Sequence, residues 1–235
     1  MKKFKKFIKH VILNSFIARI SIGFLLKLHS FSYKWSGLMA AQLNNGRHPK
    51  HEILRYKEWF LSNIQSNWVV LDIGSNDGAM PALLANKASL VYGIEISPES
   101  IAKAKQNYPL KNIQYFCADA TEFDYQICQP IHCITLSNVL EHIDNRVSFL
   151  KALVQNVNWA TLRHKKFLIR VPMINREWIV IYKKQLGMEY RLDPTHFIEY
   201  TYEIFESELK KASIEILSSK ICYGEIYAIC HVSST

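Results

Sequence analysis

The chain has 235 residues, of which 49% are hydrophobic and 21% charged, and its formal net charge is +9. This length suits one α/β domain with a full core plus an appendage, and the composition excludes a disordered or fibrous chain. The five cysteines show no C-x-x-C pair and no metal-ligand spacing, which indicates reduced thiols and a cytoplasmic protein.

Positive charge is concentrated near the N-terminus. Residues 1–58 hold twelve Lys or Arg and two Glu, whereas residues 59–235 hold seventeen basic and eighteen acidic residues. In residues 1–29 lysines alternate with large apolar residues, which is typical of a basic amphipathic helix on an anionic membrane surface. A helix packed on the domain or on a second subunit fits the pattern equally well. Arg19 and its polar neighbours argue against a signal peptide and a spanning helix.

A turn cluster at 44–49 separates a helical N-terminal segment, 1–46, from a second domain, 47–235. Apolar spacing predicts a helix over 50–64. The β-branched run 69–73 then predicts a strand buried on both faces, followed by a glycine-containing turn at 74–78 and a short helix at 79–85.

Strand and helix signals alternate regularly through the next hundred residues. Strands are predicted at 90–94, 113–117, 131–136 and 166–171, with helices at about 98–108 and 146–157. Residues 173–200 look irregular, and a helix at 201–212 precedes a hairpin of strands 214–221 and 225–232. This order predicts an α/β fold with a doubly wound, mostly parallel seven-stranded sheet and an antiparallel C-terminal hairpin strand, plus N-terminal helices.

Polar residues follow four of the predicted strands. Ligands of open α/β sheets bind beyond the carboxyl ends of the strands, where a helix N-terminus and glycine turn can approach them. Glu95 lies about 20 residues after the glycine turn, where a carboxylate can bind both ribose hydroxyls. Asp119 is placed to reach an adenine amino group. A dinucleotide fold is the competing interpretation, but the spacing is G-x-x-x-G and Asp72 precedes the first glycine.

The motifs D-I-G-S-N-D-G (72–78), C-A-D-A (117–120) and S-N-V-L-E-H-I (137–143), together with Glu95, resemble class I S-adenosylmethionine-dependent methyltransferases over about 48–232. The chain is most similar to the small-molecule O-methyltransferase branch, with ubiquinone-pathway enzymes and bacterial glycan-cluster members. R-H-P-K-H (47–51) and D-P-T-H (193–196) also resemble the glycan-associated members.

The resemblance implies a Rossmann-like methyltransferase fold and S-adenosyl-L-methionine as cofactor. It implies a cofactor site made of Asp72, Gly74, Ser75, Asn76, Gly78, Glu95, Ile96, Asp119, Ala120 and Ser137. Asn76 stands where the family pattern D-x-G-C-G-x-G has a second glycine, so close approach of a ligand at this position is in doubt.

Methyl transfer to oxygen usually needs a base for the hydroxyl proton. His142, with Glu141 beside it, is the first candidate, and His196 is the second, with Asp193 able to orient it. The alternatives are structural roles. His142 would cap a helix or stabilise a loop, and Asp193 and His196 would form a hydrogen bond that fixes a lid. No metal is predicted, because Asn138 replaces the first Glu of the Glu-x-x-Glu-His motif of ubiquinone-pathway relatives.

An acceptor-side insertion at about 172–200 mixes aromatic and basic residues that suit a sugar ring or a phosphorylated acceptor. A partly buried cap with solvated charges is the alternative. The set comprises Trp178, Tyr182, Tyr190, Phe197, Tyr200, Arg176, Lys183, Lys184 and Arg191. Nucleic acid is disfavoured, because residues 137–140 lack the N/D-P-P-Y/F motif and the basic residues alternate with apolar ones.

The sequence therefore predicts O-methylation of a sugar or of a phosphorylated or activated glycan precursor in bacterial surface polysaccharide synthesis. The protein would be cytoplasmic and held loosely at the inner membrane through residues 1–29. Two alternatives stay open: O-methylation of a lipid-soluble phenol or quinone, and a non-catalytic cofactor-binding scaffold at the membrane. An oligomer is compatible with the sequence.

Overall fold

The computed structural model describes residues 3–7, 15–46, 48–161 and 165–233. The chain forms two compact units, Met1–Leu54 and Arg55–Thr235. Of the predicted N-terminal helix, residues 1–2 and 8–14 lie outside the described residues, as does residue 47 of the R-H-P-K-H motif.

In the described part of the first unit, residues 3–7 are helical and are followed by the helices α2 (Ser15–Leu43) and α3 (Pro49–Leu54). Helix α2 ends where Asn45 and Gly46 take left-handed backbone conformations, with φ of 53° and 80°. The Gly46 N–H donates to the Ala41 carbonyl at 2.8 Å, a closure that satisfies one of the last helical carbonyls. No helix among the described residues is long and apolar enough to cross a membrane.

The second unit contains the predicted seven-stranded sheet, in the order β3-β2-β1-β4-β5-β7-β6. Strands β1 to β5 pair in parallel, and β7 is antiparallel to both β5 and β6. The predicted fold class is therefore confirmed. The strands are β1 (Val69–Ile73), β2 (Leu90–Glu95), β3 (Ile113–Cys117), β4 (Cys133–Ser137), β5 (Lys166–Pro172), β6 (Ile214–Cys222) and β7 (Glu225–Val232).

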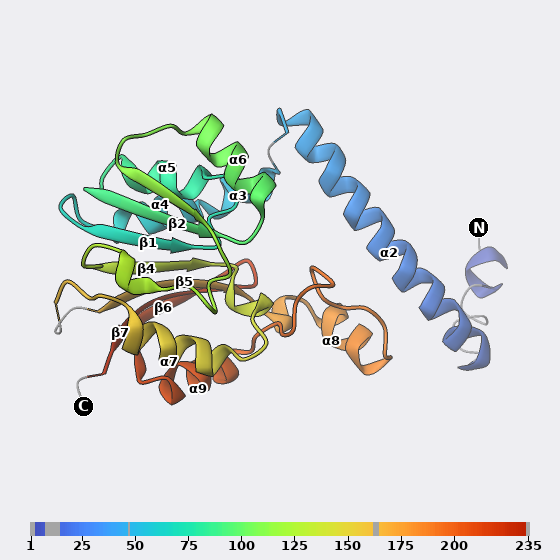
Figure 1. Ribbon diagram of the computed structural model, residues 1–235. Helices are drawn as coiled ribbons and strands as arrows, with labels where there is room; N and C mark the ends of the chain where they lie inside the picture. Colours follow the sequence, from blue (N-terminus) through green and yellow to red (C-terminus); the bar gives the residue numbers. More distant parts are fainter. Residues whose placement is uncertain (1–2, 8–14, 47, 162–164, 234–235) are drawn as a thin grey trace. The chain divides into compact units, whose positions relative to one another are not determined.

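Helices cover both faces of this sheet (Figure 1). One face carries α4 (Tyr56–Ser62), α5 (Ala79–Ala85) and α6 (Pro98–Asn107), and the other carries α7 (Arg146–Asn156) and α9 (Tyr202–Lys211). Alternate residues of a strand face the helices on opposite sides of the sheet. Val70 packs in the core with α4 and α5, whereas Leu71 packs in the core with α7 and α9. A central strand therefore has to be apolar throughout, which is why residues 69–73 predict it so clearly.

Two predicted elements differ from the structure. The helix expected over 50–64 is divided into α3 and α4, because Arg55 adopts a left-handed backbone with a φ of 47°. The segment 173–200, expected to be irregular, contains a short 3₁₀ turn at Ile174–Arg176 and the helix α8 (Trp178–Gln185). Helix α8 opens on Trp-Ile-Val-Ile-Tyr, residues that favour strands, so tertiary context overrides local preference here.

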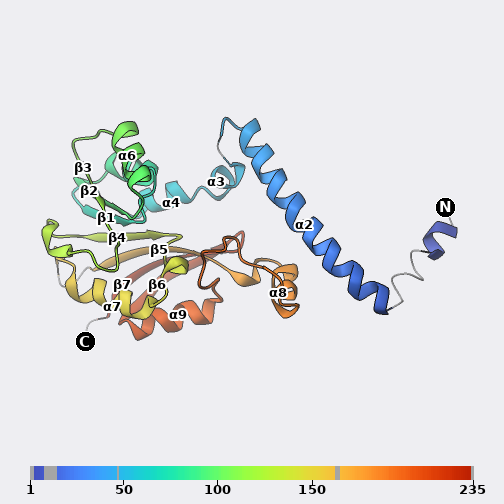
Figure 2. The ribbon, with the colours of Figure 1, turned by 45° about the vertical axis from the view of Figure 1, so that its right-hand side comes forward.

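The segment that contains α8 leaves the sheet directly after β5. Helix α8 lies beyond the sheet, on the side where the parallel strands end (Figures 1 and 2). The turn after β1 and the 3₁₀ turn Leu140–His142 after β4 also follow carboxyl ends of parallel strands. The fold thus brings the glycine turn, the two candidate histidines and the predicted acceptor-side insertion to one end of the sheet.

Candidate active site

The turn after β1 has a left-handed backbone at three positions: Gly74 (φ 73°), Asn76 (φ 46°) and Gly78 (φ 83°). The Gly74 and Ser75 N–H groups both donate to the carbonyl of Ile94, at 2.8 and 2.9 Å, and so fasten the turn to β2. Asparagine is among the few non-glycine residues that tolerate this conformation. Asn76 therefore satisfies the backbone requirement that the second glycine meets in the family pattern.

Packing within the protein also requires the two glycines. A Cβ atom at Gly74 would lie 2.6 Å from Val139 Cγ2, and one at Gly78 would lie 2.7 Å from the Tyr115 hydroxyl and 2.8 Å from Ala104 Cβ. These separations are far shorter than van der Waals contact. Gly78 thus lets the start of α5 approach α6 and β3, a role that the ligand-approach argument from sequence did not include.

Asp72 ends β1 as a buried carboxyl, 2% exposed. Its Oδ1 accepts a hydrogen bond of 2.5 Å from the Thr135 hydroxyl, while Oδ2 has no hydrogen-bond partner among the described residues. Burial raises the pKa of Asp72 to about 7, with the Thr135 hydrogen bond lowering it and Glu95 adding to the rise. A buried carboxyl oxygen without a partner is costly unless a ligand satisfies it, and a cationic group would do so best.

Glu95, at the end of β2, is held by the neighbouring backbone. Its Oε2 accepts from the N–H of Asn76 and its Oε1 from the N–H of Ser97, both at 3.0 Å. Each carboxylate oxygen keeps a second lone pair for a ligand, so the group is oriented in advance for a pair of hydroxyls. The next residue, Ile96, is 64% exposed and offers an apolar surface beside it.

Asp119 and Ala120 follow β3 and lie in a tight turn. Oδ1 of Asp119 accepts from the N–H and the hydroxyl of Thr121, at 2.8 and 2.7 Å. The Ala120 carbonyl accepts a 2.6 Å hydrogen bond from the hydroxyl of Tyr125. The Ala120 N–H and the second lone pair of its carbonyl are left for a backbone contact to an adenine ring.

Ser137 at the end of β4 contacts a buried ion pair that sequence reasoning missed. Arg170 Nε donates to Glu225 Oε2 at 2.6 Å, and Arg170 Nη1 donates to the Ser137 hydroxyl at 3.2 Å. The guanidinium carbon lies 4.0 Å from the centre of the Tyr56 ring. These residues lie far apart in the sequence, and only the pairing of β5 with β4 and β7 brings them together.

His142 is oriented by a hydrogen-bonded chain from Asp193 through Thr195. The Thr195 hydroxyl donates to Asp193 Oδ1 at 2.7 Å. The hydroxyl oxygen of Thr195 lies 2.9 Å from His142 Nδ1. Because the hydroxyl proton is already donated, Nδ1 of neutral His142 must carry its proton and donate it to Thr195. His142 Nε2 is then left with a free lone pair.

The second histidine, His196, is buried and has different partners. The Asp193 side chain bonds Thr195 rather than His196, the partner that the sequence suggested. His196 Nδ1 lies 3.4 Å from Glu199 Oε1, and its ring meets that of His142 edge to face with centroids 4.6 Å apart. Burial, with a smaller effect from His196, lowers the pKa of His142, so its ring is neutral at pH 7.

Glu141 is fully buried beside the two histidines. Neither carboxyl oxygen has a hydrogen-bond partner among the described residues, and burial raises the pKa of Glu141 to about 8. Glu141, His142 and His196 each offer one ligand atom, and these atoms lie within 4.8 Å of one another. Among the described residues, this group has ligand atoms close enough together to hold one metal ion. The sequence predicts none, and that prediction stays open.

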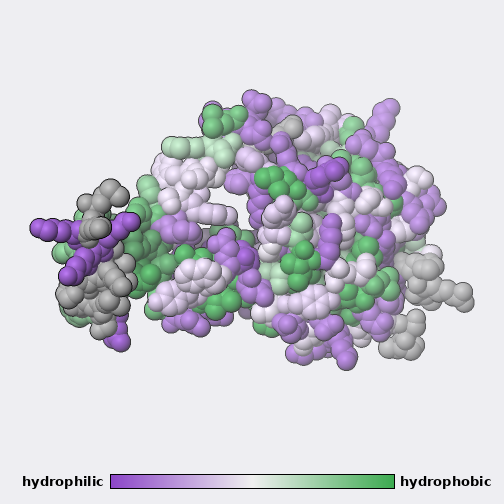
Figure 3. All heavy atoms as spheres, turned by 180° about the vertical axis from the view of Figure 1, so that it is seen from behind, coloured by the Kyte–Doolittle hydropathy of each residue, from purple (hydrophilic) through white to green (hydrophobic). Residues whose placement is uncertain are grey.

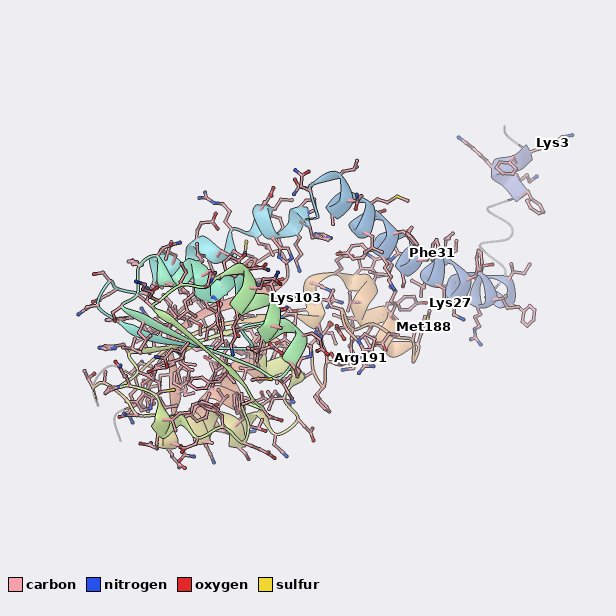
Figure 4. The ribbon with its side chains drawn as sticks, turned by 45° about the horizontal axis from the view of Figure 1, so that its top comes forward. Lys3, Lys27, Phe31, Lys103, Met188 and Arg191 are labelled. Carbon is pink, nitrogen blue, oxygen red and sulfur yellow. The ribbon has the colours of Figure 1, made fainter. Side chains whose placement is uncertain are left out.

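In the acceptor-side insertion, most of the cations have partners within the same segment. Arg176 pairs with Glu199, Arg191 pairs with Glu189 at 2.7 Å, and the Lys184 ammonium lies 5.4 Å from the centre of the Tyr190 ring. Arg191 is labelled in Figure 4. Two aromatic side chains instead face solvent: Trp178 is 74% exposed and Phe197 61%. The exposed recognition surface is therefore more aromatic than cationic.

The fold is an α/β domain whose candidate ligand site lies at the carboxyl ends of the parallel strands. Residues 71–157 match the family model described as "Methyltransferase domain". A stretch of 63 residues is 36% identical to ribosomal RNA small subunit methyltransferase A of Rubrobacter xylanophilus, covering 26% of this chain and 24% of that enzyme's length.

Solved structures share the fold at low sequence identity. An S-adenosylmethionine-dependent methyltransferase from Clostridium acetobutylicum has a TM-score of 0.58 and 14% identity, covering 86% of this chain and all of that one. N-methyltransferase NodS from Bradyrhizobium japonicum, in complex with S-adenosyl-L-homocysteine, has a TM-score of 0.55 and 15% identity, covering 77% and 85%. Residues 71–157 thus match a methyltransferase domain, and the second unit shares the fold of solved S-adenosylmethionine-dependent methyltransferases.

Proposed function

We propose that the protein is an S-adenosylmethionine-dependent O-methyltransferase whose acceptor is a sugar or an activated or phosphorylated glycan precursor of bacterial surface polysaccharide synthesis. The proposal of methylation at oxygen rests on the two consecutive hydrogen bonds that link Asp193, Thr195 and His142. It leaves an imidazole lone pair available at the end of the sheet where this class of domain binds its ligands.

The residues after β1, β2 and β3 fit the parts of the cofactor. Asp72 Oδ2, buried and without a partner among the described residues, suits the ammonium of the methionine moiety. Glu95 suits the ribose hydroxyls, and Ile96 with Asp119 suits the adenine ring and its amino group. When bound, S-adenosylmethionine supplies a sulfonium methyl group that is electrophilic enough for direct attack by an oxygen nucleophile.

His142 acts as the general base in this proposal. A hydroxyl becomes nucleophilic as its proton leaves, and a base contributes about 10²–10⁴-fold when it lies within hydrogen-bond reach. Thr195 holds the Nδ1 proton, so Nε2 accepts the acceptor's proton, and Asp193 stabilises the imidazolium through the Thr195 hydroxyl. The lowered pKa of His142 keeps this base unprotonated at neutral pH.

Exposed aromatic rings support a sugar acceptor. Trp178 and Tyr182 form a tilted pair with ring centroids 6.1 Å apart, and Phe197 is exposed next to His196 in the chain. Aromatic faces bind the apolar faces of sugar rings, while hydroxyls at the ring edge stay free to react. The internal pairing of Arg176 and Arg191 gives less support to recognition through a phosphate.

The assay uses the full chain with methyl-labelled S-adenosylmethionine and three acceptor sets: free sugars, nucleotide-activated sugars and a soluble quinol. We expect label in a sugar set. Label only in the quinol would overturn the sugar acceptor, and cofactor binding without transfer to any acceptor, including crude glycan precursors, would favour a scaffold.

Variants test the proposed base in the same assay. His142→Gln should lower kcat by roughly a hundredfold or more. Thr195→Val should lower it too, whereas Thr195→Ser keeps the hydroxyl and should retain most activity. His29→Gln, a histidine on α2, is the matched control and should change nothing. Equal turnover of His142→Gln and the wild type would remove His142 from the mechanism.

A further inference from the structure

The N-terminal unit has a charge distribution unlike that of the catalytic domain. Residues 1–51 contain ten Lys or Arg and no Asp or Glu, and the first acidic residue of the chain is Glu52. Helix α2 itself carries Arg19, Lys27 and Lys34 with no acidic residue over 29 positions. A solvated surface helix normally mixes both signs, whereas this helix has no carboxylate to compensate its positive charge.

The same helix exposes a face of large apolar side chains. Ile20, Phe24, Phe31, Trp35 and Leu38 follow helical spacing, lie on one side of α2, and are each 47–67% exposed. We call them the α2 apolar face. Figure 3 shows hydrophobic side chains, in green, gathered on this N-terminal part of the chain. None of the five belongs to the two hydrophobic cores of the second unit.

Basic residues border this face. Lys27 and Lys34 are seven residues apart and therefore project on the same side, about 40° round the helix from Phe31 and about 100° from Trp35 respectively. Lys27 and Phe31 both extend from the same stretch of α2 (Figure 4). A lysine at the border of an apolar face can leave its ammonium at the level of lipid phosphates while its methylenes cover apolar surface.

We propose that the α2 apolar face docks on an anionic lipid bilayer, with the helix lying in the plane of the headgroups. No described helix is both long and apolar enough to cross a membrane, which fits an interfacial position for α2. Phenylalanine and tryptophan side chains suit the boundary between headgroups and acyl chains. The inference is independent of the methyl acceptor.

A second copy of the chain suits this face less well. Pairing two α2 helices would bring their lysines together with no carboxylate on either helix to compensate them. Like charges placed opposite each other disfavour such an interface. An anionic bilayer supplies the missing negative charge and the apolar phase together, whereas a zwitterionic bilayer supplies only the second.

The test is co-sedimentation of the full-length protein with phosphatidylcholine vesicles, with or without phosphatidylglycerol. We expect binding only to the anionic vesicles, weakened by salt because part of the attraction is electrostatic. Equal binding to both kinds of vesicle would overturn the anionic partner. Absence of vesicle binding, with dimers detected by light scattering, would overturn the proposal and assign the face to self-association.

Two substitutions with the same charge change separate the apolar face from simple electrostatics. Phe31→Glu places a carboxylate on the apolar face, and Ser36→Glu places one about 140° away on α2. We expect Phe31→Glu to lower vesicle binding by roughly tenfold or more and Ser36→Glu to have a much smaller effect. Equal losses would overturn the role of the face. Unchanged S-adenosylmethionine binding shows that both variants are folded.

Discussion

The buried position of Asp72 makes ligand binding at the site dependent on pH. The carboxyl is buried at the end of β1, bonded to Thr135 through one oxygen and unpartnered at the other among the described residues. Its pKa, raised to about 7 mainly by burial, means that the free protein holds this group largely protonated below pH 7 and ionised above it. A cationic ligand group favours the ionised form, so ligand binding and loss of this proton are coupled.

This coupling predicts that S-adenosylmethionine affinity rises with pH between about pH 6 and 8, as Asp72 ionises. Asp72→Asn should weaken binding at pH 8 by about 10- to 100-fold and flatten the pH dependence, because a hydrogen bond to a charged group contributes about 1.5–3 kcal/mol. Calorimetry over this pH range measures both effects. Glu215→Gln, which changes an exposed carboxylate on the edge strand β6, is the control. A pH dependence that persists in Asp72→Asn would contradict the assignment.

Residues of the cofactor side could be anticipated because each follows a strand directly. Asp72 and Glu95 end β1 and β2, and the alternation of strands and helices alone places them together. The partners Thr135 and Thr195 could not be anticipated. Thr135 is 63 residues from Asp72 and Thr195 is 53 residues from His142, so each contact depends on tertiary structure. The D-P-T-H motif contained Thr195, but its sequence does not show that the hydroxyl faces a histidine in another loop.

At the scale of elements, the buried pair Arg170–Glu225 links β5 to β7 near the site. The two side chains are 5% and 1% exposed, and the guanidinium packs on Tyr56 of α4 while contacting Ser137 of β4. One ion pair thus connects three strands and the helix that precedes the sheet. A substitution that removes one partner of such a deeply buried ion pair lowers the stability of the protein, because the other charge then stays buried without its opposite charge.

Arg170→Met should therefore lower the free energy of unfolding by about 3–5 kcal/mol, since the buried Glu225 carboxylate loses its cationic partner. The double variant Arg170→Met/Glu225→Leu should recover part of this loss, because it removes both charges. Arg55→Met is the matched control: it breaks the exposed Arg55–Glu58 pair and should cost at most about 1 kcal/mol. Urea unfolding measures all three. Equal losses in Arg170→Met and Arg55→Met would contradict a buried structural pair.

Element boundaries follow sequence signals closely where local preference and burial agree. Ser97 caps α6 by accepting from the Ser100 N–H at 3.2 Å, and Pro98 begins the helix, as the sequence predicts. The exceptions are α8, whose strand-favouring residues form a helix outside the sheet, and Arg55, whose left-handed backbone divides a predicted helix. Neither the position of α8 nor the conformation of Arg55 is encoded in a short-range pattern.

At the scale of the whole molecule, the second unit has hydrophobic cores of its own. Both hydrophobic cores are built from residues at or after Tyr56, on the two faces of the sheet. Deleting residues 1–46 should therefore leave S-adenosylmethionine affinity within about twofold of the full chain and preserve cooperative unfolding, because a domain with its own core folds alone. Calorimetry and thermal unfolding measure these quantities.

The truncated protein should at the same time lose binding to anionic vesicles, since α2 is gone. Aggregation, or loss of cofactor binding after the deletion, would instead show that the N-terminal unit is part of the folded domain.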